Sequence, residues 1–163
     1  DLAQAFSLLS SRYPKARLLI VGPDEENTLD LIRKICSRSN DRLSIVGFTD
    51  NPEKYMSAAD IFCLPSYREG FGQVIAEAAA VGVPGIGSRI YGITDIIEDG
   101  LTGFLFEAGA YHDLMQKMAR FMDDRSLIRK MGDKARQIVV EKFSERKITG
   151  AMDQFYQEIG KSL

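Results

Sequence analysis

Residues 63–88, "CLPSYREGFGQVIAEAAAVGVPGIGS", decide the fold of this chain. An apolar run at 60–66, "DIFCLPS", leads into the stretch, and a Gly-rich apolar run at 83–87, "VPGIG", closes it. Both runs have the form of short buried strands, and the small and apolar residues between them predict a helix. Two parallel strands need a crossover connection, which is usually a helix. The stretch therefore predicts a βαβ unit with parallel strands.

The same alternation continues on both sides of this unit. It predicts strands at 16–22, 43–48 and 103–106, and helices at 2–12, 28–39, 52–59 and 93–100. After Gly109 the pattern is helical only, with helices expected at 110–123, 125–142 and 144–160. Repeated strand–helix units form a parallel sheet with helices on both faces. The predicted fold class is therefore α/β, a doubly wound parallel sheet with extra C-terminal helices.

The composition is that of one ordinary globular domain. The 163 residues are enough for a single core, and 21 basic against 23 acidic residues give a net charge of −2. This balance lacks the clustered basic face that nucleic acids require, so we expect no nucleic-acid partner. No stretch approaches the roughly 20 apolar residues of a membrane helix. Cys36 and Cys63 have no metal-type or redox-type neighbour, which predicts free thiols in a reducing compartment.

Gly-rich or short polar loops follow the predicted strands. In doubly wound sheets, ligands bind at the carboxyl ends of the strands. Glycine at these ends allows the backbone to come close to a ligand. Any one of these loops alone is best explained as a tight turn, but four at one sheet edge favour a binding site. They are "VGPDEEN", "VGFTDN", "PSYREGFG" and "GSRIYG".

The segment around Glu77 raises the question of why a carboxylate lies in an apolar run. If a helix begins near Phe71-Gly72, its free backbone amides form an anion site, and the lack of a Cβ at Gly72 lets the anion approach. Glu77 then lies roughly 8 Å further along the axis. Because its neighbours are apolar on nearly every side, we expect an interior helix with a carboxylate that needs a hydrogen-bonding partner. The ribose hydroxyls of a nucleotide, or alternatively a salt bridge to a nearby Arg or Lys, would satisfy this carboxylate equally well.

Glu69 lies in the loop before this helix, eight residues ahead of Glu77. Because it precedes Gly70, a turn residue or helix cap is its default explanation. It also lies at the same strand end as the predicted anion site. A carboxylate in that place is within reach of a substrate sugar.

The stretch at 65–88 resembles the signature of the retaining nucleotide-sugar glycosyltransferases of family four, which have the GT-B fold. That signature is a glutamate, seven residues and a second glutamate, with Phe-Gly inside and a Gly-x-Pro strand entry after it. Similar stretches at 17–23, 43–66, 92–106 and 143–159 extend the resemblance over essentially the whole chain. It implies the Rossmann-like half of a GT-B enzyme. The run "VPGIGSRIYG" lacks the third glycine of a dinucleotide fingerprint and predicts no NAD site.

The resemblance implies roles for the residues that match the signature. Glu77 would bind the ribose hydroxyls of the nucleotide. The backbone amides of Phe71, Gly72 and Gln73 would hold the diphosphate. Glu69 would be the catalytic residue, facing the donor sugar near the reaction centre.

Outside the signature, the resemblance implies further contacts and shows one departure. The loop at Thr49 would contact the base through its backbone, and Lys54 would reach the nucleotide unless it is simply a surface lysine. Relatives often have Gly-Gly where this chain has Tyr91-Gly92, and Glu in place of Asp95. The family generally works without a bound metal, so we expect no metal or cofactor besides a UDP- or GDP-sugar donor.

Two parts of such an enzyme are expected to precede this chain. Family members open the domain with a strand and a loop whose Arg and Lys neutralise the leaving diphosphate, and a separate N-terminal domain binds the acceptor. The resemblance thus identifies residues 1–163 as the C-terminal, donor-binding domain. Alone, the chain is expected to be inactive, with helices 125–160 packing in part toward the missing domain. The whole enzyme is expected to be cytoplasmic, with peripheral membrane contact, in polysaccharide, lipopolysaccharide or glycolipid synthesis.

Other classes fit the sequence less well. A receiver domain of a signalling protein needs an Asp at the end of a central strand, where this chain has Pro65-Ser66-Tyr67. A phosphorylase needs a lysine-linked pyridoxal site, and none can be assigned. A sugar-nucleotide epimerase would not show the spacing of Glu69 and Glu77. These enzymes and a non-catalytic nucleotide-binding module remain the alternatives.

Overall fold

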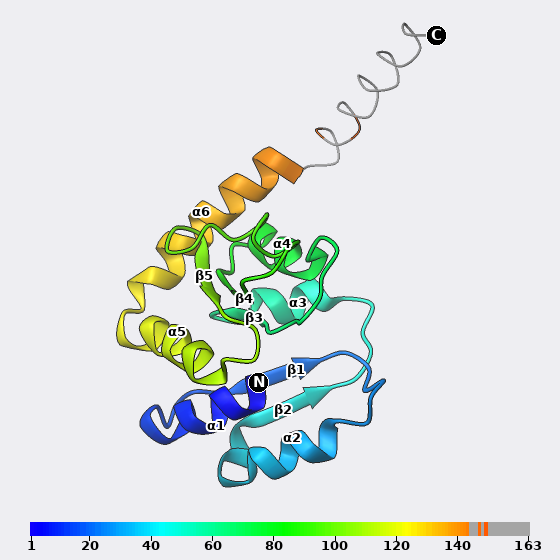
Figure 1. Cartoon of the computed structure of the whole chain (residues 1–163), viewed down its shortest axis with the longest axis vertical. Helices are drawn as coiled ribbons and strands as arrows, with labels where there is room; N and C mark the ends of the chain where they lie inside the picture. Colours follow the sequence, from blue (N-terminus) through cyan, green and yellow to red (C-terminus); the bar gives the residue numbers. More distant parts are fainter. Residues whose placement is uncertain (144–146, 148, 150–163) are drawn as a thin grey trace, which may run out of the picture.

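The computed structural model describes residues 1–143, Lys147 and Thr149. The order of elements is α1 (Leu2–Arg12), β1 (Leu18–Val21), α2 (Leu29–Ile35), the 3-10 helix η1 (Ser37–Arg42), β2 (Leu43–Val46), α3 (Pro52–Ser57), β3 (Phe62–Leu64), α4 (Gln73–Ala80), β4 (Gly85–Ser88), β5 (Gly103–Phe106), α5 (Tyr111–Asp123) and α6 (Ser126–Phe143). Helical segments and strands alternate as far as β4, and then β5, α5 and α6 follow (Figure 1). The helix predicted at 144–160 lies outside the described residues. None of the helices described is both long and apolar enough to cross a bilayer.

All strand pairs in the described part of the chain are parallel, which confirms the α/β prediction. β1 pairs with β2, and β3, β4 and β5 form a second ladder with β4 at its centre. The expected single sheet is therefore divided into two short ladders. The apolar side chains of both ladders join one buried cluster, so the two lie against a common core.

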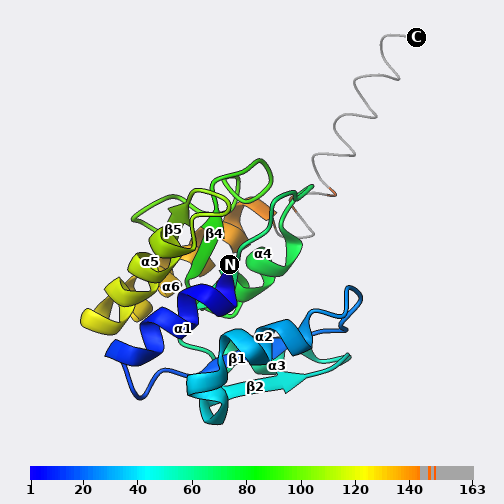
Figure 2. The ribbon, with the colours of Figure 1, turned by 60° about the horizontal axis from the view of Figure 1, so that its bottom comes forward.

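Two larger apolar clusters hold the layers together. The first contains Phe6 of α1, Ile86 of β4 and Phe104 of β5, and α1 packs against α5 beside it (Figure 2). The second joins one face of α4 to α6 and to the buried isoleucines at 93–97. Because this second cluster holds the buried face of α4 against both α6 and residues 93–97, the loop that precedes α4 has a rigid support.

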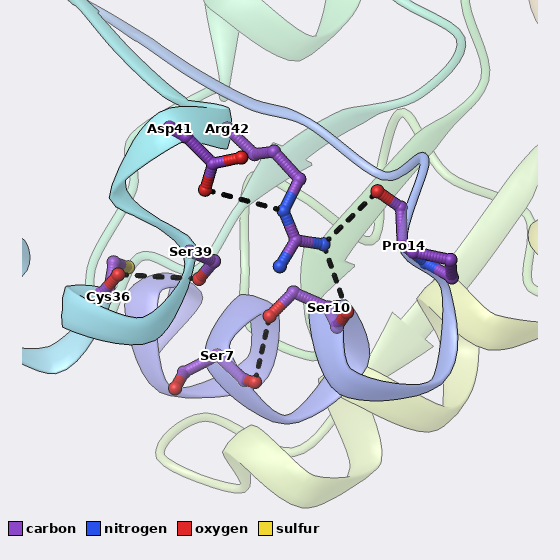
Figure 3. Close-up of polar contacts among 7 residues, drawn as sticks. All are labelled: Ser7, Ser10, Pro14, Cys36, Ser39, Asp41 and Arg42. Carbon is purple, nitrogen blue, oxygen red and sulfur yellow. Dashed lines mark hydrogen bonds and ion pairs between the residues drawn. The ribbon is translucent and has the colours of Figure 1, made fainter.

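Arg42 ties the end of η1 to the end of α1 (Figure 3). Its Nη1 donates to the carbonyl oxygens of Ser10, at 2.9 Å, and Pro14, at 3.3 Å. The Ser10 carbonyl is in the last turn of α1, where no intrahelical donor follows. The cationic guanidinium also suits the negative end of the helix dipole. Arg42 therefore caps α1 from a distant part of the sequence and fixes the start of β2.

Residues 91–96 form successive turns and residues 93–100 contain no helix, so the short helix predicted at 93–100 is wrong. Gly92 has a φ of +84°, which interrupts a right-handed helix at its start. Asp99 then forms an isolated bridge with Gly103 and leads the chain into β5. The apolar residues that suggested a helix are buried in the second cluster, so their spacing reflects packing in turns.

Candidate functional site

The loop from β3 to α4 carries the first of the two signature glutamates. It occupies 65–72, directly after the carboxyl end of β3. Ser66 Oγ donates a hydrogen bond to Glu69 Oε1 at 2.9 Å, and the side chain of Glu69 is half-buried. The second carboxylate oxygen, Oε2, has no donor among the described residues. Glu69 is therefore oriented by its own loop and keeps an acceptor for a ligand.

Glu69 borders an open pocket of about 440 Å³, lined by Tyr67, Arg68, Glu69, Gly70, Ile90 and Tyr91. The last two residues come from the loop after β4, so two strand ends meet here. Tyr67 and Tyr91 are 66% and 77% exposed. A carboxylate accepts hydrogen bonds from hydroxyls, and aromatic rings cover apolar faces. This combination suits a polyhydroxylated ligand.

The two loops that line the pocket touch through their backbones. A Cβ at Gly92 would lie 2.9 Å from the carbonyl oxygens of Glu69 and Gly70. A Cβ at Gly72 would lie 3.1 Å from the Gly92 carbonyl oxygen. Both glycines also have positive φ, +63° at Gly72 and +84° at Gly92. The close approach of these loops therefore requires glycine at both positions, and it fixes Tyr91 next to Glu69.

α4 begins at Gln73 with Gly72 as its N-cap, within one or two residues of the predicted start. The Gly72 carbonyl accepts from the amides of Ile75 and Ala76, which closes the first turn. The amides of Gln73 and Val74 have no acceptor in the part of the chain that the structure describes. They point out of the helix start and carry its positive partial charge. This is the geometry of an anion site.

Glu77 lies on the open side of α4, and the prediction of an interior helix is wrong. Only one face of α4 is buried, whereas Gln73 and Val74 are exposed and Glu77 is half-buried. Gln73 Nε2 donates to Glu77 Oε1 at 2.9 Å, and no ion pair to Glu77 is found within the described residues. The sequence misleads because Val74 and Val81 are apolar yet about 40% exposed. The Glu77 carboxylate therefore lies on the same exposed side of α4 as the free backbone amides one turn earlier.

An ion cluster supports the loop that carries Tyr91. Arg89 contacts Asp99 at 2.7 Å and Glu107 at 3.2 Å, and its backbone amide donates to the Phe106 carbonyl. Burial acts to raise the pKa of Asp99, but hydrogen bonds from the Leu105 amide and Arg89 outweigh it and hold that pKa below its usual value. The base of the loop is thus tied to both ends of β5.

Thr49 and Lys54 lie apart from the pocket lining. Thr49 follows β2, and its Oγ1 accepts from the Asn51 amide at the entry to α3. Lys54 is exposed on α3. Phe48, beside Thr49, is 76% exposed at the carboxyl end of β2. The structure therefore places the predicted base-contacting loop at a strand end, but it records no contact between that loop and Glu69 or Glu77.

Sequence reasoning missed Arg68 and Tyr67 as pocket residues. Both are exposed and lie immediately before Glu69. Their adjacency to the first signature glutamate was a usable signal, since neighbours in an irregular loop often face the same space. Tyr91 was singled out only as a departure from relatives. Its position against Glu69 depends on the backbone of Gly92 and is not readable from spacing.

Comparisons with known proteins place these features in a class. The chain is 34% identical to the N-acetyl-alpha-D-glucosaminyl L-malate synthase of Bacillus anthracis, over 98% of this chain and 42% of that protein. It is 30% identical to the capsular polysaccharide biosynthesis glycosyltransferase CapM of Staphylococcus aureus, over 96% and 41%. The crystal structure of Anabaena HepE in complex with UDP-glucose superposes with a TM-score of 0.84 at 24% identity, over 99% and 44%.

The fold and these likenesses define a GT-B glycosyltransferase domain. More specifically, the chain belongs to the family "Glycosyl transferases group 1", whose model matches residues 1–138. It spans about two fifths of the length of the curated relatives named above.

Proposed function

We propose that this chain is the donor-binding, C-terminal domain of a retaining glycosyltransferase that moves a sugar from a nucleotide sugar to an acceptor. The observation that carries the proposal is the start of α4. Its free amides lie between two carboxylates, Glu69 in the preceding loop and Glu77 one turn along the helix. A nucleotide sugar has the matching order of groups, which is a sugar, a diphosphate and a ribose.

The diphosphate would bind at the helix start. The amides of Phe71, Gly72 and Gln73 and the positive end of the helix dipole stabilise an anion there. As the bond to the sugar breaks, negative charge grows on the leaving diphosphate, and donors already in place stabilise that charge. An Arg and a Lys from a segment ahead of residue 1 would add to this effect, and no metal or other cofactor is required.

The two glutamates would hold the two ends of the donor. Glu77 accepts hydrogen bonds from the ribose hydroxyls, and Gln73 orients its carboxylate from one side. Glu69 accepts from donor-sugar hydroxyls through the oxygen that Ser66 leaves unoccupied, and it is the catalytic residue of the proposal. The loop at Thr49 would meet the base, with Lys54 at its edge.

The acceptor would come from a preceding domain, so the isolated chain is expected to bind donor without transferring sugar. One named relative is a capsular polysaccharide biosynthesis glycosyltransferase, another is an N-acetyl-alpha-D-glucosaminyl L-malate synthase, and one solved structure with the same fold holds UDP-glucose. These names support a nucleotide-sugar donor and an acceptor in polysaccharide assembly; the proposal takes the donor to be a UDP- or GDP-sugar and extends the acceptors to lipopolysaccharide and glycolipid. A cytoplasmic enzyme with peripheral membrane contact fits that setting.

The test is ligand-observed NMR with this chain and UDP, GDP, ADP and their glucose conjugates. One nucleotide is expected to bind, and Glu77→Ala should weaken it roughly 10- to 100-fold, because hydrogen bonds to a charged group contribute about 1.5–3 kcal/mol. Glu141→Ala, an exposed glutamate on α6, is the matched control and should change nothing. Binding that survives Glu77→Ala would move the nucleotide away from α4 and contradict the proposed site.

A further inference from the structure

Tyr91 is a large aromatic side chain held out on a rigid turn. Tyr91 is 77% exposed, although the residues around it are anchored. The amides of Ile93 and Thr94 both donate to the Ile90 carbonyl, and Ile93 is fully buried. On the other side, Arg89 ties the chain to Asp99 and Glu107. The backbone that presents Tyr91 is therefore fixed before any ligand arrives.

The ring shares its pocket with the catalytic carboxylate of the proposed function. Tyr91 and Glu69 line the same open space of about 440 Å³. The contact of Gly92 with the Glu69 and Gly70 carbonyls sets the distance between them. A single exposed aromatic side chain needs no explanation on an ordinary surface. Tyr91 differs from such a residue because it stands on a fixed turn beside the half-buried Glu69. The ring and the carboxylate can therefore contact the same ligand.

We infer that Tyr91 is a specificity-determining residue whose ring stacks on the sugar ring of the donor while Glu69 binds that sugar's hydroxyls. The inference rests on the proposed function of this site. A pyranose offers both features, with hydroxyls around its edge and a face of C–H groups. The aromatic ring covers such a face, and the carboxylate accepts from the edge. Tyr91 thus favours donors whose sugar presents a flat C–H face, as glucose does.

The test compares a nucleoside diphosphate with its glucose conjugate on this chain. For whichever of UDP, GDP or ADP binds, the affinity gained from the attached glucose is measured by titration for the wild type and three variants. Tyr91→Ala should reduce that gain roughly three- to tenfold, while binding of the free diphosphate stays unchanged. Tyr91→Phe keeps the ring and should keep the gain. Leu31→Ala removes an exposed side chain on α2 and should have no effect.

The outcomes separate the two proposals. If no diphosphate binds, or if Glu77→Ala leaves its affinity unchanged, the proposed function is contradicted, and so is the inference that rests on it. Suppose instead that the diphosphate binds through Glu77, but the attached glucose adds no affinity, or adds the same affinity in the wild type and in Tyr91→Ala. Only the inference on Tyr91 is then overturned. Free glucose is also titrated in the presence of the diphosphate. If Tyr91→Ala weakens only the binding of this free glucose, the ring contacts an acceptor sugar, and the inference on Tyr91 is again overturned.

Discussion

The backbone of Gly92 lies against the backbone of Glu69, so close that a Cβ on Gly92 would sit 2.9 Å from the Glu69 carbonyl oxygen. This contact joins the loops after β3 and β4 at the carboxyl ends of their strands. It positions the proposed catalytic carboxylate without involving its side chain. The geometry of the site therefore depends on a residue that has no chemistry of its own.

Gly92→Ala should lower the free energy of unfolding and also weaken sugar binding. The positive φ costs a non-glycine residue about 1–3 kcal/mol, and overlap with the facing carbonyls adds a similar amount. Gly100→Ala is the matched control, because Gly100 has a φ of +80° and open space around its Cβ position. Urea unfolding should show Gly92→Ala to be less stable than Gly100→Ala by at least about 1 kcal/mol. Equal losses would show that the contact between the loops contributes nothing.

Asp99 predicts a pH dependence of stability. Its pKa is lowered in the folded state, so its contribution is complete above the unfolded value, about 3.9, and is lost as pH falls through the folded pKa. Asp99→Asn should therefore be less stable than the wild type near neutral pH, and the difference should shrink in acid. Unfolding by urea at a series of pH values measures it. In Arg89→Gln, the loss should be smaller and complete at a higher pH, because one cause of the lowered folded-state pKa of Asp99 is gone. A difference between wild type and Asp99→Asn that stays constant down to the lowest pH would contradict this account.

Arg42→Met should destabilise the protein by about 1–3 kcal/mol, since it removes charge-assisted hydrogen bonds to the part-buried Ser10 carbonyl at the end of α1 and to the exposed Pro14 carbonyl after it. The side chain of Arg42 is only 16% exposed, so methionine keeps most of its packing and removes the hydrogen bonds. Arg38→Met changes an exposed arginine of the same 3-10 helix and should be neutral. Thermal unfolding of the two variants decides the matter. Similar melting temperatures would mean that water replaces the Arg42 hydrogen bonds at no cost.

Local patterns predicted the elements that carry this site. Buried apolar runs gave the strands, and the loop 65–72 with the start of α4 followed from residue types alone. The pattern failed where burial depends on distant neighbours. Val74 is apolar but exposed, and the isoleucines at 93–97 are buried in turns. Apolar residues report how much surface could be buried, and only tertiary packing decides which face is covered.

The pocket itself was beyond the reach of the sequence. Glu69 and Glu77 were found from their spacing, whereas the meeting of Glu69 with Tyr91 depends on two glycine backbones that approach through space. Contacts of this kind carry no periodicity and no charge pattern. The same is true of Arg42, whose partners in and after α1 lie about thirty residues earlier.

The contact of Phe71 with Phe143 predicts that the end of α6 stabilises the start of α4. The rings meet edge to face with centroids 5.2 Å apart, and Phe71 is part of the proposed diphosphate loop. A double-mutant cycle with Phe71→Leu and Phe143→Leu should give a coupling of about 0.5–1.5 kcal/mol in urea unfolding, because leucine keeps much of the buried area and removes the aromatic pair.

Val140→Ala tests whether α6 matters in general, since Val140 is 53% exposed on the same helix. It should show no coupling to Phe71→Leu. Phe143→Leu should also weaken binding of the nucleoside diphosphate, because the loop that presents the amides loses a support on one side. A coupling near zero, together with unchanged diphosphate binding, would mean that α6 ends beside the site without contributing to it. A measurable coupling would instead make the end of α6 part of what holds the anion site in place.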